Sequence, residues 1–340
     1  MPRSRRYPIP SLALAAALVA FAPAPARALH ATGQPGPGSL QTTASGVSFS
    51  LGTSVGVVEG TASELAFYYP NGKKFKLSEL TWDIKDVVMA GLHGSMGIGR
   101  RIRLNLGVWS ALTEGNGTMV DRDWDYPASV SAFLEPNAGN WTHESQHPDT
   151  SLDSGVSFDT NANVMAIQAG PFSLHGILGV KRDDWQWSAR GGTYIYSTLY
   201  PGSRDRTGAF PEGQQVISYE QKYLIPYLGV GANLTWPAFL IESHLLYGPA
   251  VSASDSDYHA LRGVLFEGDY SGGTYVGLGL NATWAFARHW SATLGVEYQS
   301  ISEITGDITV SGAEGSGKFS DGGGLAMSAM LFSLGAGFRF

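Results

Sequence analysis

The chain contains no cysteine among its 340 residues, which excludes disulfide bonds and thiolate chemistry. Beyond its first few dozen residues, no apolar run reaches the ~18 residues that a membrane-spanning helix needs. Charged residues make up only 15% of the chain, and acidic residues outnumber basic ones by 29 to 22. An acidic chain is a poor ligand for nucleic acid, so we expect cationic partners instead.

The first residues have the three-part pattern of a secretory signal peptide. Three early arginines precede a short apolar stretch at residues 11–22, and a small-x-small cleavage motif ends at Ala28. We therefore expect residues 1–28 to be removed and residues 29–340 to form one domain. Loss of the four arginines in this segment takes the formal net charge from −7 to −11, which adds to the expected attraction for cations.

Apolar residues alternate with small or polar ones through most of the remaining chain. In "YVGLGLNATWAF" (275–286), the large apolar side chains take one face and Gly, Asn and Thr take the other. The stretches 290–299 and 330–340 alternate in the same way, and the second ends on an aromatic residue, Phe340. A period of two residues predicts β-strands.

Two all-β architectures fit this alternation: a soluble β-sandwich and a transmembrane barrel. The small, polar second face is typical of a barrel lumen, and aromatic residues near strand ends are typical of interfacial girdles. With the signal peptide, these features predict an all-β, ten-stranded antiparallel transmembrane β-barrel in the outer membrane of a Gram-negative cell. Strands of about 20 residues are longer than the membrane requires, so the barrel should project above it.

The expected strands are joined alternately by short turns and longer outer loops. We expect strands near 46–69, 74–95, 100–122, 153–170, 173–197, 217–234, 238–256, 259–285, 289–306 and 323–340. Outer loops are then expected near 70–73, 124–152, 198–216, 255–260 and 307–322.

Charged residues with a period of two mark two of the strand tops. In "SASDSDYHALRG" (252–263), Asp255, Asp257 and His259 fall at every second position, and in "TMVDRDWDYP" Asp121 and Asp123 do the same. In an extended chain each set shares a face, and the two sets would look across the barrel mouth at each other. Four interpretations remain open on spacing alone: solvated surface charges, a cation site, an aspartate dyad sharing one proton, and a His–Asp couple that activates water.

Four separated segments resemble the signature segments of the omptins, a family of outer-membrane endopeptidases built on ten-stranded barrels. They read "MVDRDW", "WTHESQHPDTSLD", "SARGGTYIYS" and "DSDYHA", and the resemblance runs from about Ser48 to Phe340. It implies cleavage of peptide bonds at Arg or Lys, an active site facing the exterior and no metal or organic cofactor. The competing hypothesis is a non-enzymatic barrel, such as an adhesin or receptor, that binds cationic ligands through its acidic mouth.

The resemblance implies that Asp121, Asp123, Asp257 and His259 are the catalytic groups. His259 would take a proton from a water molecule, and Asp257 would orient its ring and stabilise the imidazolium. Asp121 would help to position the water from the opposite side, with Asp123 supporting it.

Substrate binding is implied at three further residues. Glu64 and Asp255 match the two carboxylates that hold the basic side chain before the cleaved bond, where charge-assisted hydrogen bonds would form. In "WTHES", His143 stands where the family often has an acidic residue. That acid contributes to the preference for the substrate residue that follows the cleaved bond. We therefore expect weaker selection for Lys at that position.

A second departure from the family concerns lipid. The family is similar to other outer-membrane proteins in using a Tyr-x-Glu-x-Arg run to hold lipopolysaccharide phosphates, whereas the corresponding run here is "VKRDD" (180–184). If the protein requires lipopolysaccharide, the candidates for the phosphate contact are Lys181, Arg182 and Lys222.

Overall fold

The structure is a computed structural model that describes residues 46–340, so the expected signal peptide at residues 1–28 lies outside the described residues. No helix in the described part of the chain is both long and apolar enough to cross a membrane. Its strands and helices are β1 (Val47–Tyr68), the 3₁₀ turn η1 (Pro70–Gly72), β2 (Phe75–Ile98), β3 (Ile102–Ala111), β4 (Gly117–Asp123), α1 (Ala128–Ser131), β5 (His143–Ala169), β6 (Phe172–Arg190), β7 (Thr193–Tyr196), β8 (Arg206–Ala209), β9 (Gln215–Thr235), β10 (Phe239–His259), β11 (Val264–Ala285), β12 (Trp290–Gly312) and β13 (Gly315–Arg339).

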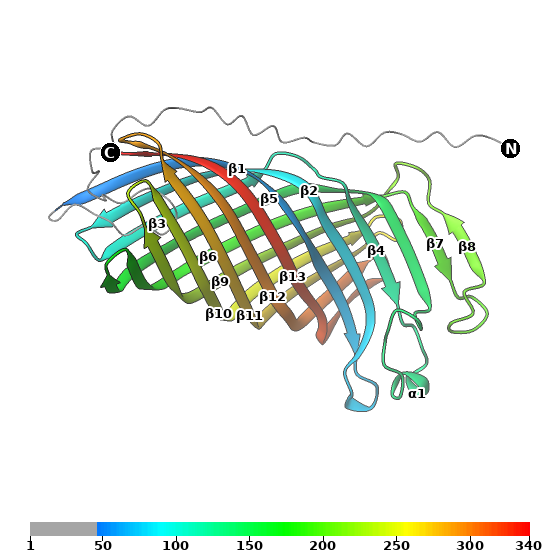
Figure 1. Ribbon diagram of the computed structural model, residues 1–340. Helices are drawn as coiled ribbons and strands as arrows, with labels where there is room; N and C mark the ends of the chain where they lie inside the picture. The colour runs from blue at the N-terminus through cyan, green and yellow to red at the C-terminus, as the bar shows by residue number, and fades with distance from the viewer. Residues whose placement is uncertain (1–45) are drawn as a thin grey trace.

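The long strands close into a ring because β1 pairs with both β2 and β13. Val55 in β1 lies opposite Ala90 on one side and Leu334 on the other. From β2 the ring continues through β3 and β4, then β5, β6, β9, β10, β11 and β12 to β13, with antiparallel pairing throughout. Because β3 and β4 are two parts of one interrupted strand, the ring contains ten strands, as predicted (Figure 1).

The interruption of the expected strand at 100–122 is a bulge at residues 112–116. Asn116 donates its backbone N–H to the carbonyl of Lys85 at 2.9 Å, which ties the bulge to β2. Gly115 has a φ of +71°, and a Cβ there would lie 2.3 Å from the Lys85 oxygen, so the bulge requires glycine at this position. The bulge lets β4 restart with its own alternation of inward and outward side chains.

Several strands extend farther than the sequence pattern predicts. β5 begins at His143, and β10 runs through to His259, so the outer loop expected at 255–260 is instead a turn at residues 260–263. Much of the loop expected at 307–322 belongs to the β12–β13 hairpin. The upper ends of these strands are rich in Gly, Ser and charged residues, so apolar and polar residues alternate only weakly there. Backbone hydrogen bonds to neighbouring strands extend the strands through these segments.

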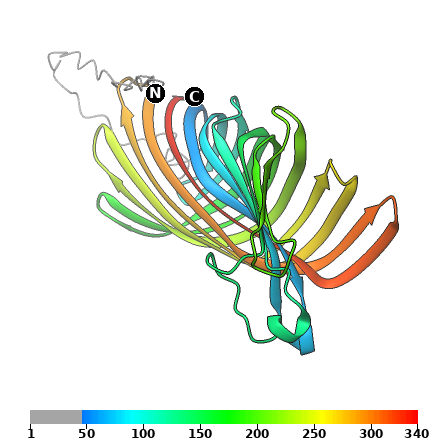
Figure 2. The ribbon, with the colours of Figure 1, turned by 90° about the vertical axis from the view of Figure 1, so that its right-hand side faces the viewer.

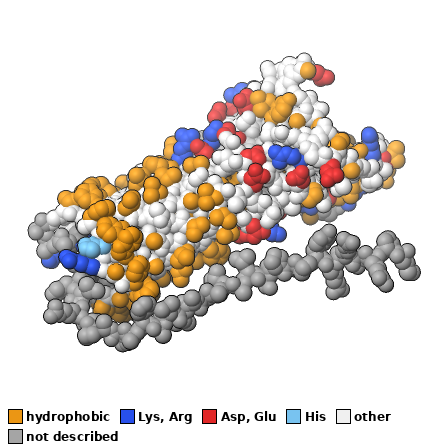
Figure 3. Space-filling model, turned by 90° about the horizontal axis from the view of Figure 1, so that it is seen from above, with side chains coloured by type: hydrophobic (Ala, Val, Ile, Leu, Met, Phe, Trp, Pro, Cys, Tyr) orange, Lys and Arg blue, Asp and Glu red, His pale blue; other side chains and the backbone are white. Residues whose placement is uncertain are grey.

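Apolar side chains cover the outside of the half of the barrel that carries the C-terminus. In Figure 3 this half is covered mainly by hydrophobic side chains, whereas charged side chains gather at the other end. Leu178, Leu228 and Leu245 on three neighbouring strands are 69%, 55% and 48% exposed, which is stable only against lipid. Exposed aromatic residues mark the end near the C-terminus: Trp236, Phe239, Trp284, Phe286, Trp290 and Phe340. The belt and girdle confirm the predicted transmembrane barrel.

The outward-facing row of side chains changes from apolar to charged partway along the strands. On β6, Val180 is followed on the same face by Arg182, and on the adjacent β9, exposed Leu224 is followed by Lys222. Both strands are 19 residues or longer, against about 9–11 for a membrane-spanning strand. The upper part of the barrel therefore projects into water, as expected.

Figure 2 looks onto the projecting end, where the β1–β2 tip and the segment carrying α1 stand out together. Lys73 after η1 forms an ion pair with Glu135 after α1. Below them, Phe75, Trp124 and Trp141 form a small apolar cluster of their own. These contacts fix the position of the chain between β4 and β5.

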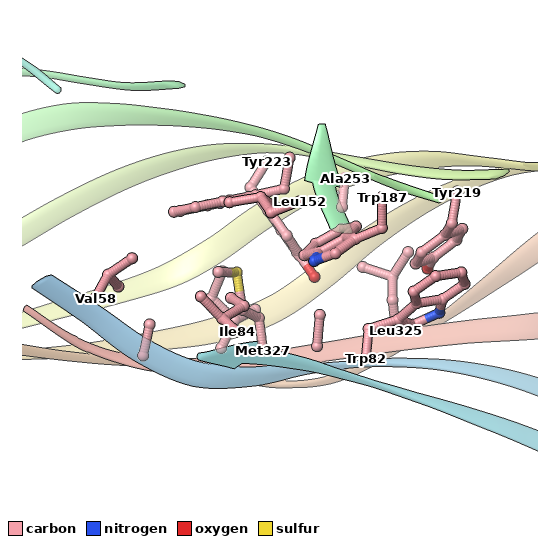
Figure 4. Packing of buried hydrophobic residues seen from close by; sticks show 14 of the residues in the cluster. Val58, Trp82, Ile84, Leu152, Trp187, Tyr219, Tyr223, Ala253, Leu325 and Met327 are labelled. Atoms are coloured by element: carbon pink, nitrogen blue, oxygen red, sulfur yellow. The ribbon is translucent and has the colours of Figure 1, made fainter. Parts of the chain in front are cut away.

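An aromatic layer fills the barrel interior between the apolar half and the projecting half. Trp82 stacks on Tyr219 with ring centroids 5.3 Å apart and lies 6.0 Å from Trp187, and all three are almost completely buried (Figure 4). On the membrane side of this layer, polar side chains such as Asn105, His175 and Glu242 line a cavity of about 250 Å³. The layer gives the projecting half a rigid floor.

Trp82→Ala tests whether this layer stabilises the barrel. We expect the free energy of unfolding to fall by about 3–5 kcal/mol, because the substitution leaves a large cavity between stacked rings. Denaturant unfolding in detergent measures the change. Phe133→Ala is the matched control, since Phe133 is 88% exposed and should shift the result by less than about 0.5 kcal/mol. Equal effects in the two variants would contradict a stabilising role for the layer.

Candidate active site

The last residues of β10 carry three of the predicted site residues on the inner face of the barrel. Asp255 and Asp257 are 9% and 1% exposed, whereas Tyr258 on the other face is 42% exposed. His259 Nε2 lies 2.5 Å from Asp257 Oδ2. The alternation of inward and outward side chains predicted from the sequence therefore holds to the end of β10. Lys222 lies opposite Ser254, so the three side chains stand above the level of Lys222.

Asp121 and Asp123 point inward from β4, between β2 and β5. Ser78 on β2 lies opposite Asp123 in the sheet and donates a hydrogen bond from its hydroxyl to Asp121 Oδ1 at 3.4 Å. Burial raises the pKa of Asp121 well above its usual value, and the charges of Asp123 and Asp257 raise it further. Since Asp257 belongs to β10, the two acidic pairs face the same space across the barrel mouth.

Glu64 reaches the same space from β1. Burial, followed by the charges of Asp257 and Asp255, raises its pKa well above normal, so the three carboxyl groups lie close together. Glu64 Oε2 and Asp257 Oδ1 have no hydrogen-bond partner. Buried, unpartnered carboxylate oxygens suit a cationic side chain that brings its own donors.

Asp255 is held by two tyrosines that the sequence reasoning missed. Tyr270 Oη donates to Asp255 Oδ1 at 3.0 Å, and Tyr219 Oη donates to Oδ2 at 3.3 Å. Gln221 supports Tyr219 by donating to its hydroxyl at 2.7 Å. Burial raises the pKa of Asp255 to about 7, while the Tyr270 hydrogen bond acts in the opposite direction.

His143 lies beside the Asp121–Asp123 pair. It is opposite Asp123 in the β4–β5 ladder, and its ring centroid is 5.2 Å from that of Tyr196. Tyr196 comes from β7, a short strand paired with β5. Burial and the nearby charges of Asp121 and Asp123 raise the pKa of Tyr196 to about 12, so its hydroxyl stays protonated above the cleft.

The residues proposed for lipid contact divide into two groups. Arg182 and Lys222 face outward, and each is paired with an acid, Asp184 at 3.1 Å and Glu220 at 2.5 Å. Lys181 instead points into the barrel, where it pairs with fully buried Asp183 at 3.4 Å. The expectation that Lys181 contacts lipid is therefore wrong, because adjacent residues of a strand face opposite sides of the sheet.

Arg262, like the two tyrosines on Asp255, was not predicted from the sequence. It lies in the turn after β10, and its guanidinium donates a hydrogen bond to His259 Nδ1. Its position three residues after His259, in a four-residue turn, is the one signal in the sequence that marks it. No three His, Asp or Glu side chains within residues 46–340 are grouped as a metal site.

The fold and the site define an outer-membrane β-barrel with a cleft of carboxylates and histidine at its projecting end. Residues 45–340 match the model of the Omptin family, and the chain belongs to that family. It is 26% identical over 294 residues to the plasminogen activator of Yersinia pestis, covering 86% of this chain and 89% of that protein. It is 30% identical over 230 residues to the outer-membrane protease OmpP of Escherichia coli, covering 67% and 69% respectively.

A solved structure agrees with the fold. The crystal structure of the outer-membrane protease OmpT from Escherichia coli superposes with a TM-score of 0.79, covering 86% of this chain and 97% of that one at 24% identity. The family match and the protease relatives together support a peptide hydrolase in the outer membrane.

Tyr270→Phe tests the electrostatic control of Asp255. Loss of the hydroxyl raises the pKa of Asp255 above about 7, so more of it is protonated at neutral pH. We expect the affinity for a cationic peptide to fall about tenfold at pH 7 and by much less at pH 9, where the carboxylate is ionised in both proteins. Peptide titration followed by fluorescence anisotropy measures this difference. Tyr258→Phe, on the outer face, is the control, and a loss that is independent of pH would contradict the prediction.

Proposed function

We propose that the protein is an endopeptidase that hydrolyses peptide bonds at Arg or Lys in a cleft facing the cell exterior. The observation that carries this proposal is the short His259–Asp257 contact facing Asp121 across a cleft of buried carboxylates. Membership of the Omptin family supports the same reaction class.

The reaction needs a base, an orienting group and a positioned water. His259 takes a proton from water as the oxygen adds to the substrate carbonyl carbon, and it returns that proton to the departing amine. Asp257 orients the ring and stabilises the imidazolium between these steps. Asp121 holds the water from the other wall, and Asp123 keeps the local field negative. Water is the nucleophile, so no acyl-enzyme forms and no cofactor takes part.

Specificity for basic residues follows from the buried carboxylates. The side chain before the cleaved bond enters between Glu64 and Asp255, where an Arg or Lys supplies the donor that Glu64 Oε2 lacks and adds a charge-assisted hydrogen bond to Asp255. Burial raises the pKa values of both groups because it disfavours their charged forms. A cation that enters the pocket favours the ionised forms again. The acidic mouth also attracts cationic peptides from solution.

We propose Arg182 and Lys222 as the residues that contact outer-membrane lipid, with lipopolysaccharide phosphates as the ligand. Both face outward at the upper edge of the apolar belt, where phosphates of the outer leaflet would lie. Their local acidic partners reduce the free positive charge at this edge. A dependence of activity on lipopolysaccharide would therefore be weaker than with unpaired basic residues.

His259→Ala is the direct test of the protease. We expect the refolded protein to cleave a quenched fluorescent peptide with a central Arg-Arg bond, with EDTA present, and the variant to lose at least about 100-fold in rate. His289→Ala, in an exposed turn at the membrane end, should cleave normally.

Peptide binding without cleavage by the unaltered, folded barrel would favour a non-enzymatic receptor for cationic ligands. Loss of cleavage on adding EDTA would favour a metal-dependent hydrolase. Parallel reactions with lipopolysaccharide measure the lipid dependence.

The pH profile tests the role of His259 separately. A base must be neutral to accept a proton, so activity should fall as the pH is lowered and the imidazole becomes protonated. Initial rates on the same peptide between pH 5 and 9 provide the measurement. A rate that stays constant down to pH 5 would argue against His259 as the base.

His143 leads to a prediction about the residue after the cleaved bond. An imidazole in place of a carboxylate offers less attraction for a cationic side chain, although Asp123 lies opposite it. We expect a peptide library varied at that position to show only weak preference for Lys. The variant His143→Asp should strengthen the preference for Lys, and a strong preference in the unaltered protein would refute the idea.

A further inference from the structure

The turn between β10 and β11 directs Arg262 back over His259. The backbone N–H groups of Arg262 and Gly263 both donate to the carbonyl of His259, at 3.1 and 2.9 Å. Gly263 closes the turn with a φ of +62°, a conformation that favours glycine. The side chain of Arg262 then donates to Nδ1 of the same histidine. Main chain and side chain of the turn therefore act on one residue.

These contacts occupy both nitrogens of the His259 ring. Arginine is protonated and has donors only, so Nδ1 accepts from Arg262 and carries no proton. The ring proton then lies on Nε2, facing Asp257 Oδ2 at 2.5 Å. In this arrangement neither nitrogen is free to accept a proton from water. The contact must open before His259 can act as a base.

Arg262 also neutralises part of the acidic cleft. Burial raises the pKa values of Asp121 and Asp123 on the opposite wall, and the charge of Arg262 acts in the opposite direction by favouring their ionised forms. Its guanidinium carbon lies 5.9 Å from the ring centroid of Phe266, whose ring is 5.2 Å from that of His259. Arg262 is exposed to solvent, so it can swing outward without uncovering buried apolar surface.

We infer that Arg262 is a positioning residue that occupies the cleft as an internal cation and leaves when the basic side chain of a substrate replaces it. This inference rests on the proposed endopeptidase activity. In the resting protein Arg262 fixes the His259 tautomer and compensates Asp121 and Asp123. Any cationic substrate must displace Arg262 before His259 can act, so the free energy of its contacts in the resting protein is subtracted from the affinity of the substrate. Arg262 thereby competes with the substrate for the cleft.

The test compares two quenched fluorescent peptides that differ only after the cleaved bond, one Arg-Arg and one Arg-Ala. Three variants are compared with the unaltered barrel: Arg262→Gln, Arg262→Lys and, as a control for loss of one cation, Arg288→Gln in an exposed turn at the membrane end. Retention of the β-sheet circular-dichroism signal verifies that each variant is folded.

We expect Arg262→Gln to raise kcat/KM about tenfold for both peptides through a lower KM, because Arg262 leaves the cleft in both complexes and the variant loses only the competing cation of the free protein. Arg262→Lys keeps the competing charge and should stay close to the unaltered protein, which a purely structural role of the turn would not explain. Arg288→Gln should match the unaltered protein.

Other outcomes overturn the inference. Loss of cleavage of both peptides by folded Arg262→Gln would mean that the guanidinium assists the reaction itself, for example by donating to the tetrahedral oxyanion. An unchanged KM for both peptides in Arg262→Gln would mean that Arg262 does not compete with substrate. If neither the unaltered protein nor Arg288→Gln cleaves either peptide, the proposed endopeptidase activity fails instead, and this result is distinct from the other two.

Discussion

Closure of the sheet is the constraint on which the rest of this structure depends. In the hydrocarbon of a membrane every backbone N–H and C=O must be satisfied within the protein, and the pairing of β1 with β13 achieves this. The same ladder of hydrogen bonds continues above the apolar belt, so the strand tops stay rigid in water. The residues of the cleft therefore lie on strands rather than on loops, which holds like charges close together against their repulsion.

The cleft concentrates carboxyl groups that would separate on a flexible chain. Glu64, Asp121 and Asp255 come from three different strands, and burial raises the pKa of each. Burying these carboxyl groups costs desolvation free energy, and a cationic side chain offsets that cost when it binds. Affinity and specificity for cationic substrates therefore have the same physical origin. The aromatic layer around Trp82 keeps this cleft apart from the polar cavity on the membrane side.

The inner side chains of β10 and β4 could be predicted from alternation, because a period of two assigns a face without knowledge of neighbours. The error at Lys181 arose where that rule was set aside: its neighbour Arg182 faces outward, so Lys181 had to face the lumen. The bulge at residues 112–116 and the extended top of β10 were not predictable, because pairing with neighbouring strands determines both. Glu64 could be matched to the site only through family resemblance, since nothing in its own segment marks it as functional.

The sequence by itself determined the all-β class, the transmembrane barrel, the inward faces of the acidic motifs and the family, because these depend on local periodicity and on short segments in order. Only the tertiary structure decided which charges meet. The contact of Glu64 with Asp257, the tyrosines on Asp255 and the guanidinium of Arg262 on His259 join residues whose proximity depends on ring closure and on turn geometry. Electrostatic interactions act through space, so no pattern along the chain specifies them.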